Sequence, residues 1–207
     1  KMHNFYHKNY PYTVEYEVEV ELNGLFNLPE WQPMSGPEMA IEKSSLTVVA
    51  PKNYTLRYKQ LRYNGEPIVK EEKSSKYYQW QMAGQKAVAD ELFSPEWDDI
   101  STRVLIAPSA FEMGGYKGDM SDWHGFGKFM QTLYSGRDVL PADIKATVHQ
   151  HTDHLKTNKE KINALYKFMQ DNTRYISIQL GIRGCQPLDA KFVAQKKYGD
   201  CKALSNY

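Results

Sequence analysis

"SDWHGFGKFMQTLY", residues 121–134, is the stretch in which the spacing of apolar residues changes from that of a strand to that of a helix. Its apolar residues recur at three- and four-residue intervals, as on one face of a helix: Trp123, Phe126, Phe129, Met130 and Leu133. Ser121 is placed to cap this helix. Strand-like alternation precedes the stretch and helical spacing follows it, which predicts an α+β fold whose boundary lies within residues 108–140.

Five stretches before this helix have the period of a β-strand. The clearest is "YTVEYEVEVEL", residues 12–22, where tyrosine, valine and leucine alternate with four glutamates, as in a half-buried strand with a wet acidic face. The other four are residues 44–51, 54–63, 76–82 and 102–108. A slip in the alternation of residues 54–63 predicts a bulge near Lys59 and Gln60. Strands at this spacing predict an antiparallel, β-sandwich-like domain over residues 1–135.

The remainder of the chain, residues 136–207, favours helices. Pro141 suits the first position of a helix whose shared face carries Ile144, Val148, His151 and Leu155. Thr157 and Glu160 fit a capping box that opens the next helix. The buried side of that helix is expected to hold Ile162, Leu165, Tyr166 and Met169.

The last part of the chain mixes a strand, a loop and two short helices. Residues 174–181 alternate as a strand, and the glycine- and proline-containing residues 181–187 form a loop. A short helix is predicted over residues 189–197. Tyr198 and Gly199 then end this helix, and Asp200 can cap a final helix that begins at Cys201.

Composition sets limits on the class of protein. The chain has 207 residues, of which 41% are hydrophobic and 25% charged, as in an ordinary globular protein. Its net charge of +1 gives no reason to expect a nucleic-acid partner. No apolar run approaches the roughly 18 residues that a membrane span requires. Two cysteines are too few for a disulfide framework, and although they could pair with each other, we favour free thiols.

Cys201 is the strongest candidate for chemistry. A cysteine in the first turn of a helix lies at the positive end of the helix dipole, which favours the thiolate. Its own amide could donate to an oxyanion, and Gly199 would allow close approach of backbone. The alternative is that Cys201 is a small hydrophobic core residue, as most lone cysteines are.

Two groups of motifs resemble known families. "YGDCKALSNY" and the preceding "TRYISIQLGIRGCQPLDAKFVAQKK" resemble the beginning of a bacterial transglutaminase-like domain, of the cysteine-protease-like superfamily with a Cys-His-Asp triad. Residues 5–140 resemble the β-domain of unknown function that precedes such domains in Bacteroidetes proteins. The motifs that carry this second resemblance are "YPYTVEYEVEV", "SSLTVVAP" and "SGRDVLP".

The resemblance implies a role for individual residues. Cys201 matches the nucleophile, and Gly199 and Asp200 match the turn that presents it. Gln186 is implied to help position the substrate or the oxyanion. Cys185 stands where the family has an aromatic residue, and we expect it to be a buried substitute for that ring.

The implied function is part of a peptidase or amidase that acts on peptide or protein amides without a cofactor. Residues 136–207 would be the first half of the transglutaminase-like domain, both ends of the chain would be truncated, and the histidine and aspartate would lie downstream. The fragment alone is then expected to be inactive. The alternative is a non-catalytic scaffold whose β-domain binds a glycan or a protein. The resemblance suggests export to the periplasm or cell surface.

Two further groups of residues are candidate binding sites. His149 and Asp153, in "HQHTDH", are four apart on a helix and could share a metal. We favour a solvated helix with one packed histidine and expect no metal. The four tryptophans could form a sugar-stacking platform, but core packing explains them more simply: Trp31, Trp80, Trp97 and Trp123.

Overall fold

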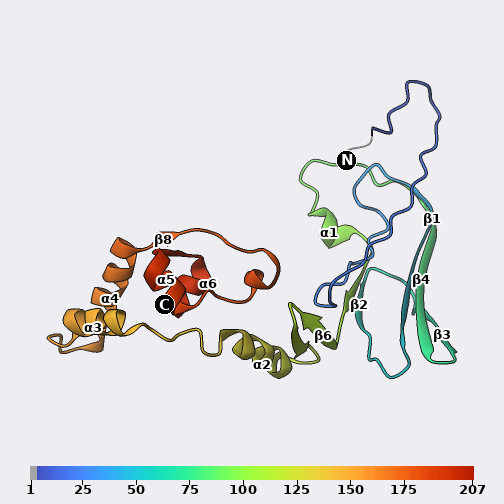
Figure 1. Cartoon of the computed structure of the whole chain (residues 1–207). Helices are drawn as coiled ribbons and strands as arrows, with labels where there is room; N and C mark the ends of the chain where they lie inside the picture. The colour runs from blue at the N-terminus through green and yellow to red at the C-terminus, as the bar shows by residue number, and fades with distance from the viewer. Residues whose placement is uncertain (1–3) are drawn as a thin grey trace.

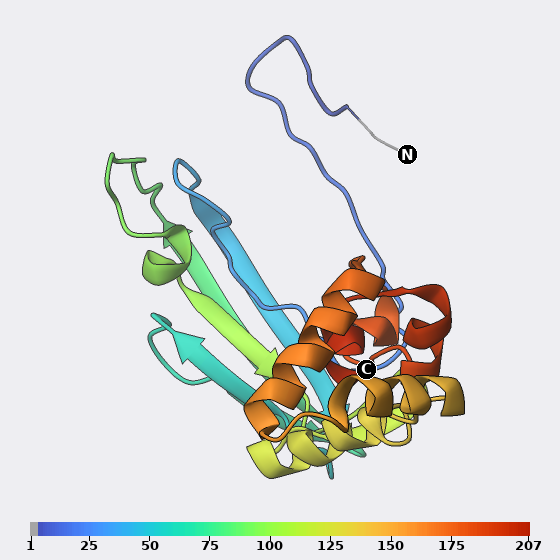
Figure 2. The same ribbon diagram turned by 90° about the vertical axis from the view of Figure 1, so that its left-hand side faces the viewer.

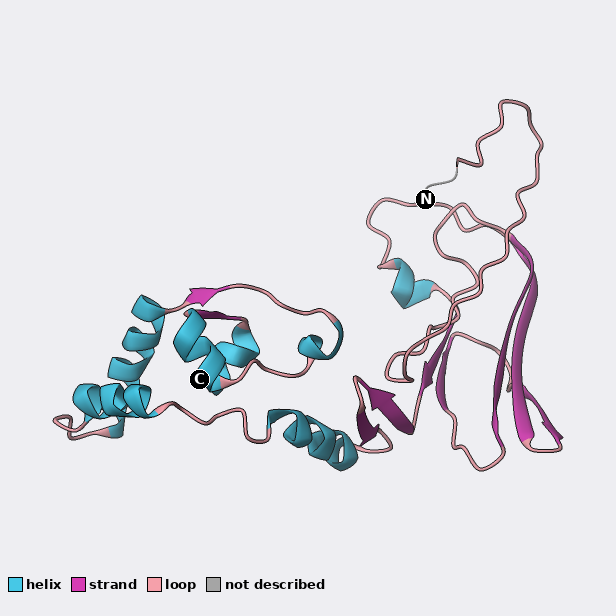
Figure 3. Cartoon of the chain, viewed as in Figure 1, coloured by secondary structure: helices cyan, strands magenta, loops and turns pink. Residues whose placement is uncertain are grey.

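The computed structural model describes residues 4–207. Most strands lie in the first part of the chain and most helices in the second (Figure 1). Figure 3 shows most strands gathered at one end and most helices at the other. The first sheet has the order β1-β4-β3 and the second pairs β2 with β5, all antiparallel. These strands are β1 (Ile41–Pro51), β2 (Arg57–Leu61), β3 (Ile68–Glu72), β4 (Ser75–Gln85) and β5 (Arg103–Ala107).

The first hydrophobic core lies between these two sheets. Its buried members come from both sheets and from the bridge between Trp31 and Val104: Trp31, Leu56, Tyr78, Trp80 and Val104. Trp80 is fully buried, and its Nε1 donates to Gln60 Oε1 at 2.7 Å. Two antiparallel sheets that share an apolar interior confirm the predicted sandwich-like class at this end of an α+β chain.

The strand predicted at residues 12–22 is wrong. These residues form no ladder with any other part of the described chain, and in both Figure 1 and Figure 2 the blue N-terminal segment loops out from the sheets. Its apolar side chains are exposed, with Tyr16 at 73% and Val18 at 70%. The alternation of apolar and polar residues indicates which side chains could face a core, but a strand also needs a hydrogen-bonded neighbour.

The other four predicted strands are present with different ends. The bulge at Lys59 and Gln60 is wrong, because β2 pairs with β5 in an unbroken register. The alternation slips because a polar residue, Gln60, takes the position in phase with Tyr58, where its Oε1 accepts from core residue Trp80. Six elements were not predicted: β3, α1 (Trp97–Ile100), β6 (Ala110–Met113), β7 (Tyr116–Asp119), the 3-10 helix η1 (Gly181–Gly184) and β9 (Tyr198–Gly199).

The helices follow the predicted spacing closely. In α2 (Trp123–Tyr134) the capping residue is Asp122 rather than Ser121, because the Asp122 carboxylate accepts from the Gly125 amide at 2.7 Å. In α3 (Ala142–Thr152) Pro141 is the cap, one position before its predicted place. The capping box at the start of α4 (Asn158–Asn172) is confirmed, with both reciprocal hydrogen bonds between Thr157 and Glu160.

The predicted strand over residues 174–181 is reduced to two residues. β8 (Arg174–Tyr175) pairs in parallel with β9 (Tyr198–Gly199), and the rest runs as a loop in which Leu180 is 85% exposed. The short helix α5 (Ala190–Lys196) and the final helix α6 (Cys201–Asn206) are confirmed. Within residues 4–207, no helix combines the length and apolarity needed to cross a bilayer.

A second hydrophobic core joins the two halves of the chain. Phe111, Phe129 and Leu133 are buried at its centre, so that β6 and β7 pack against α2. Ile182 and Cys185, from the loop before α5, pack against the same cluster. The predicted division after residue 135 remains a prediction, and this core contains residues from both sides of it.

The solvent-accessible surface of the chain is larger than that of a compact protein of the same mass. It exposes 15536 Å² at a mass of 24.0 kDa, about one and a half times the roughly 10,000 Å² of a compact monomer of that mass. Part of the excess comes from residues 12–22. Another part comes from α4, which has no buried residue.

Candidate functional site

The turn between β9 and α6 presents Cys201 as the sequence predicts. Asp200 is the cap of α6, and its Oδ1 accepts from the Ala203 amide at 2.9 Å. Asp200 is only 3% exposed, whereas Cys201 is exposed at the first residue of the helix. A buried cap fixes the backbone of the turn, so that the thiol has a defined position although it faces solvent.

Lys202 forms the second contact that holds Asp200. Its Nζ lies 2.5 Å from Asp200 Oδ2, and both side chains are largely buried. Burial pushes the pKa of Asp200 upward, but hydrogen bonds from Lys202 and the Ala203 amide outweigh it and leave that pKa below its ordinary value. Burial likewise opposes the charge of Lys202, and its hydrogen bond to Asp200 raises the Lys202 pKa overall. Cys201 therefore stands in the sequence between a carboxylate and an ammonium that are paired with each other.

Gly199 is required by close packing beneath the turn. A Cβ at this position would lie 2.9 Å from the Ala203 Cβ and 3.4 Å from Val193 Cγ2. The Gly199 carbonyl accepts from the Ile176 amide at 3.0 Å, which ties β9 to the residue after β8. The absence of a side chain at Gly199 therefore permits close packing of β9 against α6.

Replacing Gly199 by alanine should destabilise the fold by roughly 1–3 kcal/mol, because the new methyl group must displace the first turn of α6. Urea unfolding would measure this change. Gly127→Ala is the matched control, since no atom lies within 4 Å of a Cβ there and the site is an exposed helix position. That control should stabilise by roughly 0.5–1 kcal/mol. Equal effects of the two substitutions would contradict the packing argument.

Cys201 lines an open, mostly apolar hollow of about 730 Å³. The side of α4 that was predicted to be buried forms one wall. The prediction is wrong for Ile162, 65% exposed, and Tyr166, 57% exposed, whereas Leu165 and Met169 are half-buried. The other walls come from α3, β8 and α6. The lining residues are Leu140, Ile144, Val148, Ile162, Leu165, Tyr166, Phe168, Met169, Tyr175, Cys201, Leu204, Ser205 and Tyr207.

The hollow has no general base in the described part of the chain, because no histidine or carboxylate lines it. The ring of His151 lies 5.0 Å from that of Phe168, a wall residue. His151 is exposed and does not itself line the hollow. The hollow thus combines an exposed thiol with an apolar surface.

Gln186 is not brought to Cys201. It is buried, and its Nε2 donates to the Tyr116 hydroxyl of β7 at 3.1 Å. Hydrogen bonds from Gln186 and then from Arg137 lower the pKa of Tyr116. The residue proposed from resemblance for substrate positioning therefore connects the loop before α5 to the β-domain.

The two cysteines are both free. Cys185 is half-buried against the second hydrophobic core, and its substitution for an aromatic ring stays a prediction. His149 Nδ1 lies 3.0 Å from Asp153 Oδ1, as their spacing predicts, and both side chains are 70% exposed. Within residues 4–207 no three histidine, cysteine, aspartate or glutamate residues are arranged to hold a metal ion.

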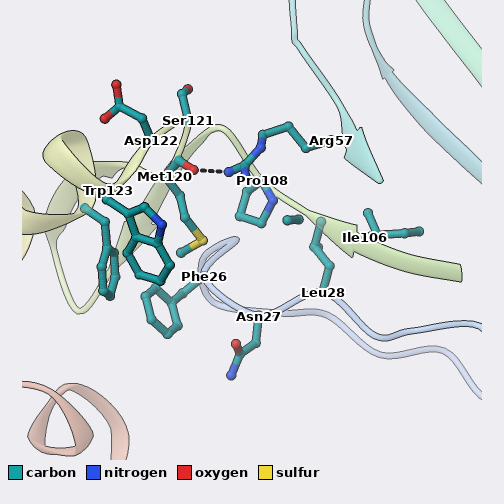
Figure 4. Close-up of a pocket in the computed structure, with 12 residues that line it drawn as sticks. Phe26, Asn27, Leu28, Arg57, Ile106, Pro108, Met120, Ser121, Asp122 and Trp123 are labelled. Carbon is teal, nitrogen blue, oxygen red and sulfur yellow. Dashed lines mark hydrogen bonds between the residues drawn. The ribbon is translucent and has the colours of Figure 1, made fainter. Parts of the chain in front are cut away.

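A second hollow, also of about 730 Å³, lies where the start of α2 meets the end of β5 and residues 26–28 (Figure 4). Trp123 borders it and is 88% exposed, unlike Trp31 and Trp80, which are core residues as expected. Its charged side chains are already engaged. Asp122 caps α2, and Arg57 donates to the Met120 carbonyl, the dashed line in Figure 4. The hollow thus offers mainly apolar contact.

Comparisons with known proteins identify two likenesses. Residues 1–89, fewer than half of the chain, match the family described as "Domain of Unknown Function with solved-structure structure (DUF3857)". A crystal structure described as a "putative protease" from Parabacteroides distasonis covers 86% of this chain with a TM-score of 0.50 and 14% sequence identity. At that identity the likeness concerns the fold. No curated protein matches the chain.

The chain spans 33% of the length of the Parabacteroides protein to which it is similar. Residues 1–89 are thus similar to the DUF3857 model, and the fold of the chain resembles a part of that larger protein.

Proposed function

We propose that this chain carries the nucleophile's part of a transglutaminase-like cysteine hydrolase that acts on peptide or protein amides. The observation that carries the proposal is the placement of Cys201. Its thiol is exposed at the start of α6, on the edge of an apolar hollow, above a turn held by buried Asp200. The fold likeness to a protein described as a protease supports the class of reaction loosely.

The chemistry follows from the groups that are present. The Cys201 thiolate attacks the amide carbonyl, and the carbonyl oxygen becomes an oxyanion to which backbone N–H groups at the start of α6 can donate. The acyl group passes to the sulfur and then to water or an amine. A histidine must take the thiol proton and return it to the leaving amine.

The resemblance implies that this histidine, and an aspartate that orients it, follow the residues of this chain. We call the combination of this chain with that segment the longer protein. Chain order within a triad is free in principle, but no histidine among residues 4–207 lines the hollow. The 207-residue chain alone is therefore expected to be inactive. Export to the periplasm or cell surface is part of the same proposal.

A peptidyl vinyl sulfone, an electrophile that traps activated thiolates, tests the proposal. In the longer protein Cys201 should react at least about 100-fold faster than Cys185, because a base activates the one thiol alone. In the 207-residue chain both thiols should react slowly. Peptide mass spectrometry would measure the labelled fraction of each cysteine over time. Equal labelling rates of Cys201 in the two proteins would contradict the proposal.

A further inference from the structure

Arg137, in the "SGRDVLP" stretch after α2, forms hydrogen bonds to three helical segments. Its Nε donates to the Leu133 carbonyl of α2 at 3.0 Å, and its Nη1 lies 2.7 Å from Asp189 Oδ1 at the start of α5. Its backbone carbonyl accepts from the Ala190 amide at 2.7 Å and from Asn206 Nδ2 at 2.8 Å. One residue thus joins α2 to the first residue of α5 and to the end of α6, the helix that begins with Cys201.

A second connection links the same region to the β-domain. Gln186, three residues before Asp189, donates to the Tyr116 hydroxyl on β7. The phenol also interacts with Arg137, since both residues lower its pKa. Tyr116 is therefore a shared partner of the loop before α5 and of the residue that anchors α5.

An apolar contact completes the connection. Ile182 and Cys185 pack against the core that contains Phe111 of β6. Gly114, between β6 and β7, faces Ile182 so closely that a Cβ would lie 2.9 Å from the Ile182 Cβ. Figure 1 shows the orange loop after β8 reaching back toward α2 and β6, far from α4.

We infer that Arg137, Tyr116, Gln186 and the Gly114–Ile182 contact form an interdomain clamp that fixes the Cys201 helix relative to the β-domain. The functional role of the clamp rests on the proposed function. A substrate would bind a rigid surface that includes both the Cys201 thiol and the β-domain. Arg137 is a positioning residue in this arrangement, and Gln186 acts through Tyr116.

The strength of the clamp lies in the number of elements that it joins. Asp189 is 56% exposed, so its ion pair with Arg137 contributes little by itself. The planar guanidinium, in contrast, reaches α2 and α5 at once, and this geometry is one that lysine cannot reproduce. Rotation of α5 and α6 away from β7 would break the polar contacts and the Ile182 contact together.

Spin-label distance measurements test the clamp directly. Nitroxides are attached to Lys59→Cys on β2 and Gln195→Cys on α5, both exposed positions, in a chain carrying Cys185→Ala and Cys201→Ser. The expected result is one narrow distance distribution. Arg137→Met should broaden it at least about twofold, because the second domain then samples further orientations. Lys128→Met, which removes an exposed cation of α2, should leave it unchanged.

Two glycines provide a matched pair for the apolar contact. Gly114 and Gly115 both have left-handed φ angles, 57° and 83°, so alanine strains the backbone at either position. A Cβ meets Ile182 at Gly114, whereas no atom lies within 4 Å at Gly115. Gly114→Ala should therefore broaden the distribution and Gly115→Ala should not.

Unchanged distributions in both Arg137→Met and Gly114→Ala would overturn the clamp, as would equal broadening in Gly115→Ala. Circular dichroism melts identify any variant that is unfolded, and either of the two clamp variants is then sufficient. Because the labelled chain lacks Cys201, the measurement does not depend on thiol chemistry. A rigid clamp with an unreactive Cys201 would refute the proposed function alone.

Discussion

Replacing Cys201 by alanine in the longer protein is expected to lower its rate of amide hydrolysis by about 10⁴-fold or more. The reason is that the acyl group has no sulfur to which it can transfer, so the covalent route is lost entirely. Cleavage of a fluorogenic peptide amide, with kcat and KM measured separately, gives the result. The loss should fall on kcat, since the apolar walls of the hollow remain in place.

Cys185→Ala is the control for this experiment, because it removes the other thiol from a half-buried position in the second core. It should change kcat by less than about threefold, with at most a modest loss of stability from the smaller side chain. Undiminished activity of the Cys201→Ala variant would refute the catalytic assignment. A collapse of activity in Cys185→Ala alone would point to the other thiol.

Asp200→Ala is expected to destabilise the chain by about 2–4 kcal/mol, the largest effect on stability that we predict within the site. The substitution removes the cap of α6 and leaves the largely buried Lys202 ammonium without its partner. Urea unfolding at pH 7 measures the change. Asp200→Asn keeps an oxygen for the Ala203 amide and loses only the charge, so it should cost less. A loss below about 0.5 kcal/mol in Asp200→Ala would contradict the pairing.

The pH dependence of this effect has a definite sign. The folded pKa of Asp200 lies below its ordinary value, so its contribution to stability is complete above the unfolded pKa near 4 and is lost as the pH falls through the folded pKa. The Lys202 pKa is raised, so its contribution is complete below about pH 10 and is lost as the pH rises through the folded pKa. The difference between wild type and Asp200→Ala should therefore be constant near neutrality and shrink in strong acid. A difference that grows on acidification would contradict the assignment.

Features that depend on neighbours in the chain could be predicted from the sequence. The capping box of Thr157 and Glu160 is made by groups three residues apart. The turn in which Asp200 caps a helix beginning at Cys201 is equally local. The change in the spacing of apolar residues near residue 121 likewise predicts the order of strands and helices, because this spacing differs between the two kinds of element.

Burial could not be predicted in the same way. Residues 12–22 and the apolar side of α4 have the patterns of half-buried elements, but in the structure Tyr16 and Val18 of the first and Ile162 and Tyr166 of the second are exposed. A pattern shows which face of an element can be buried. Whether it is buried depends on a second element, whose position is a property of the tertiary structure.

The sequence by itself thus determined the α+β order, the local turn at Cys201 and the residues that could act there. The tertiary structure alone decided that Gln186 meets Tyr116, 70 residues away, rather than the thiol, and that Arg137 joins α2 to both ends of the α5–α6 segment. The physical reason is that hydrogen bonds and van der Waals contacts act over a few ångströms in space. Distant residues make them only after the strands and helices have packed.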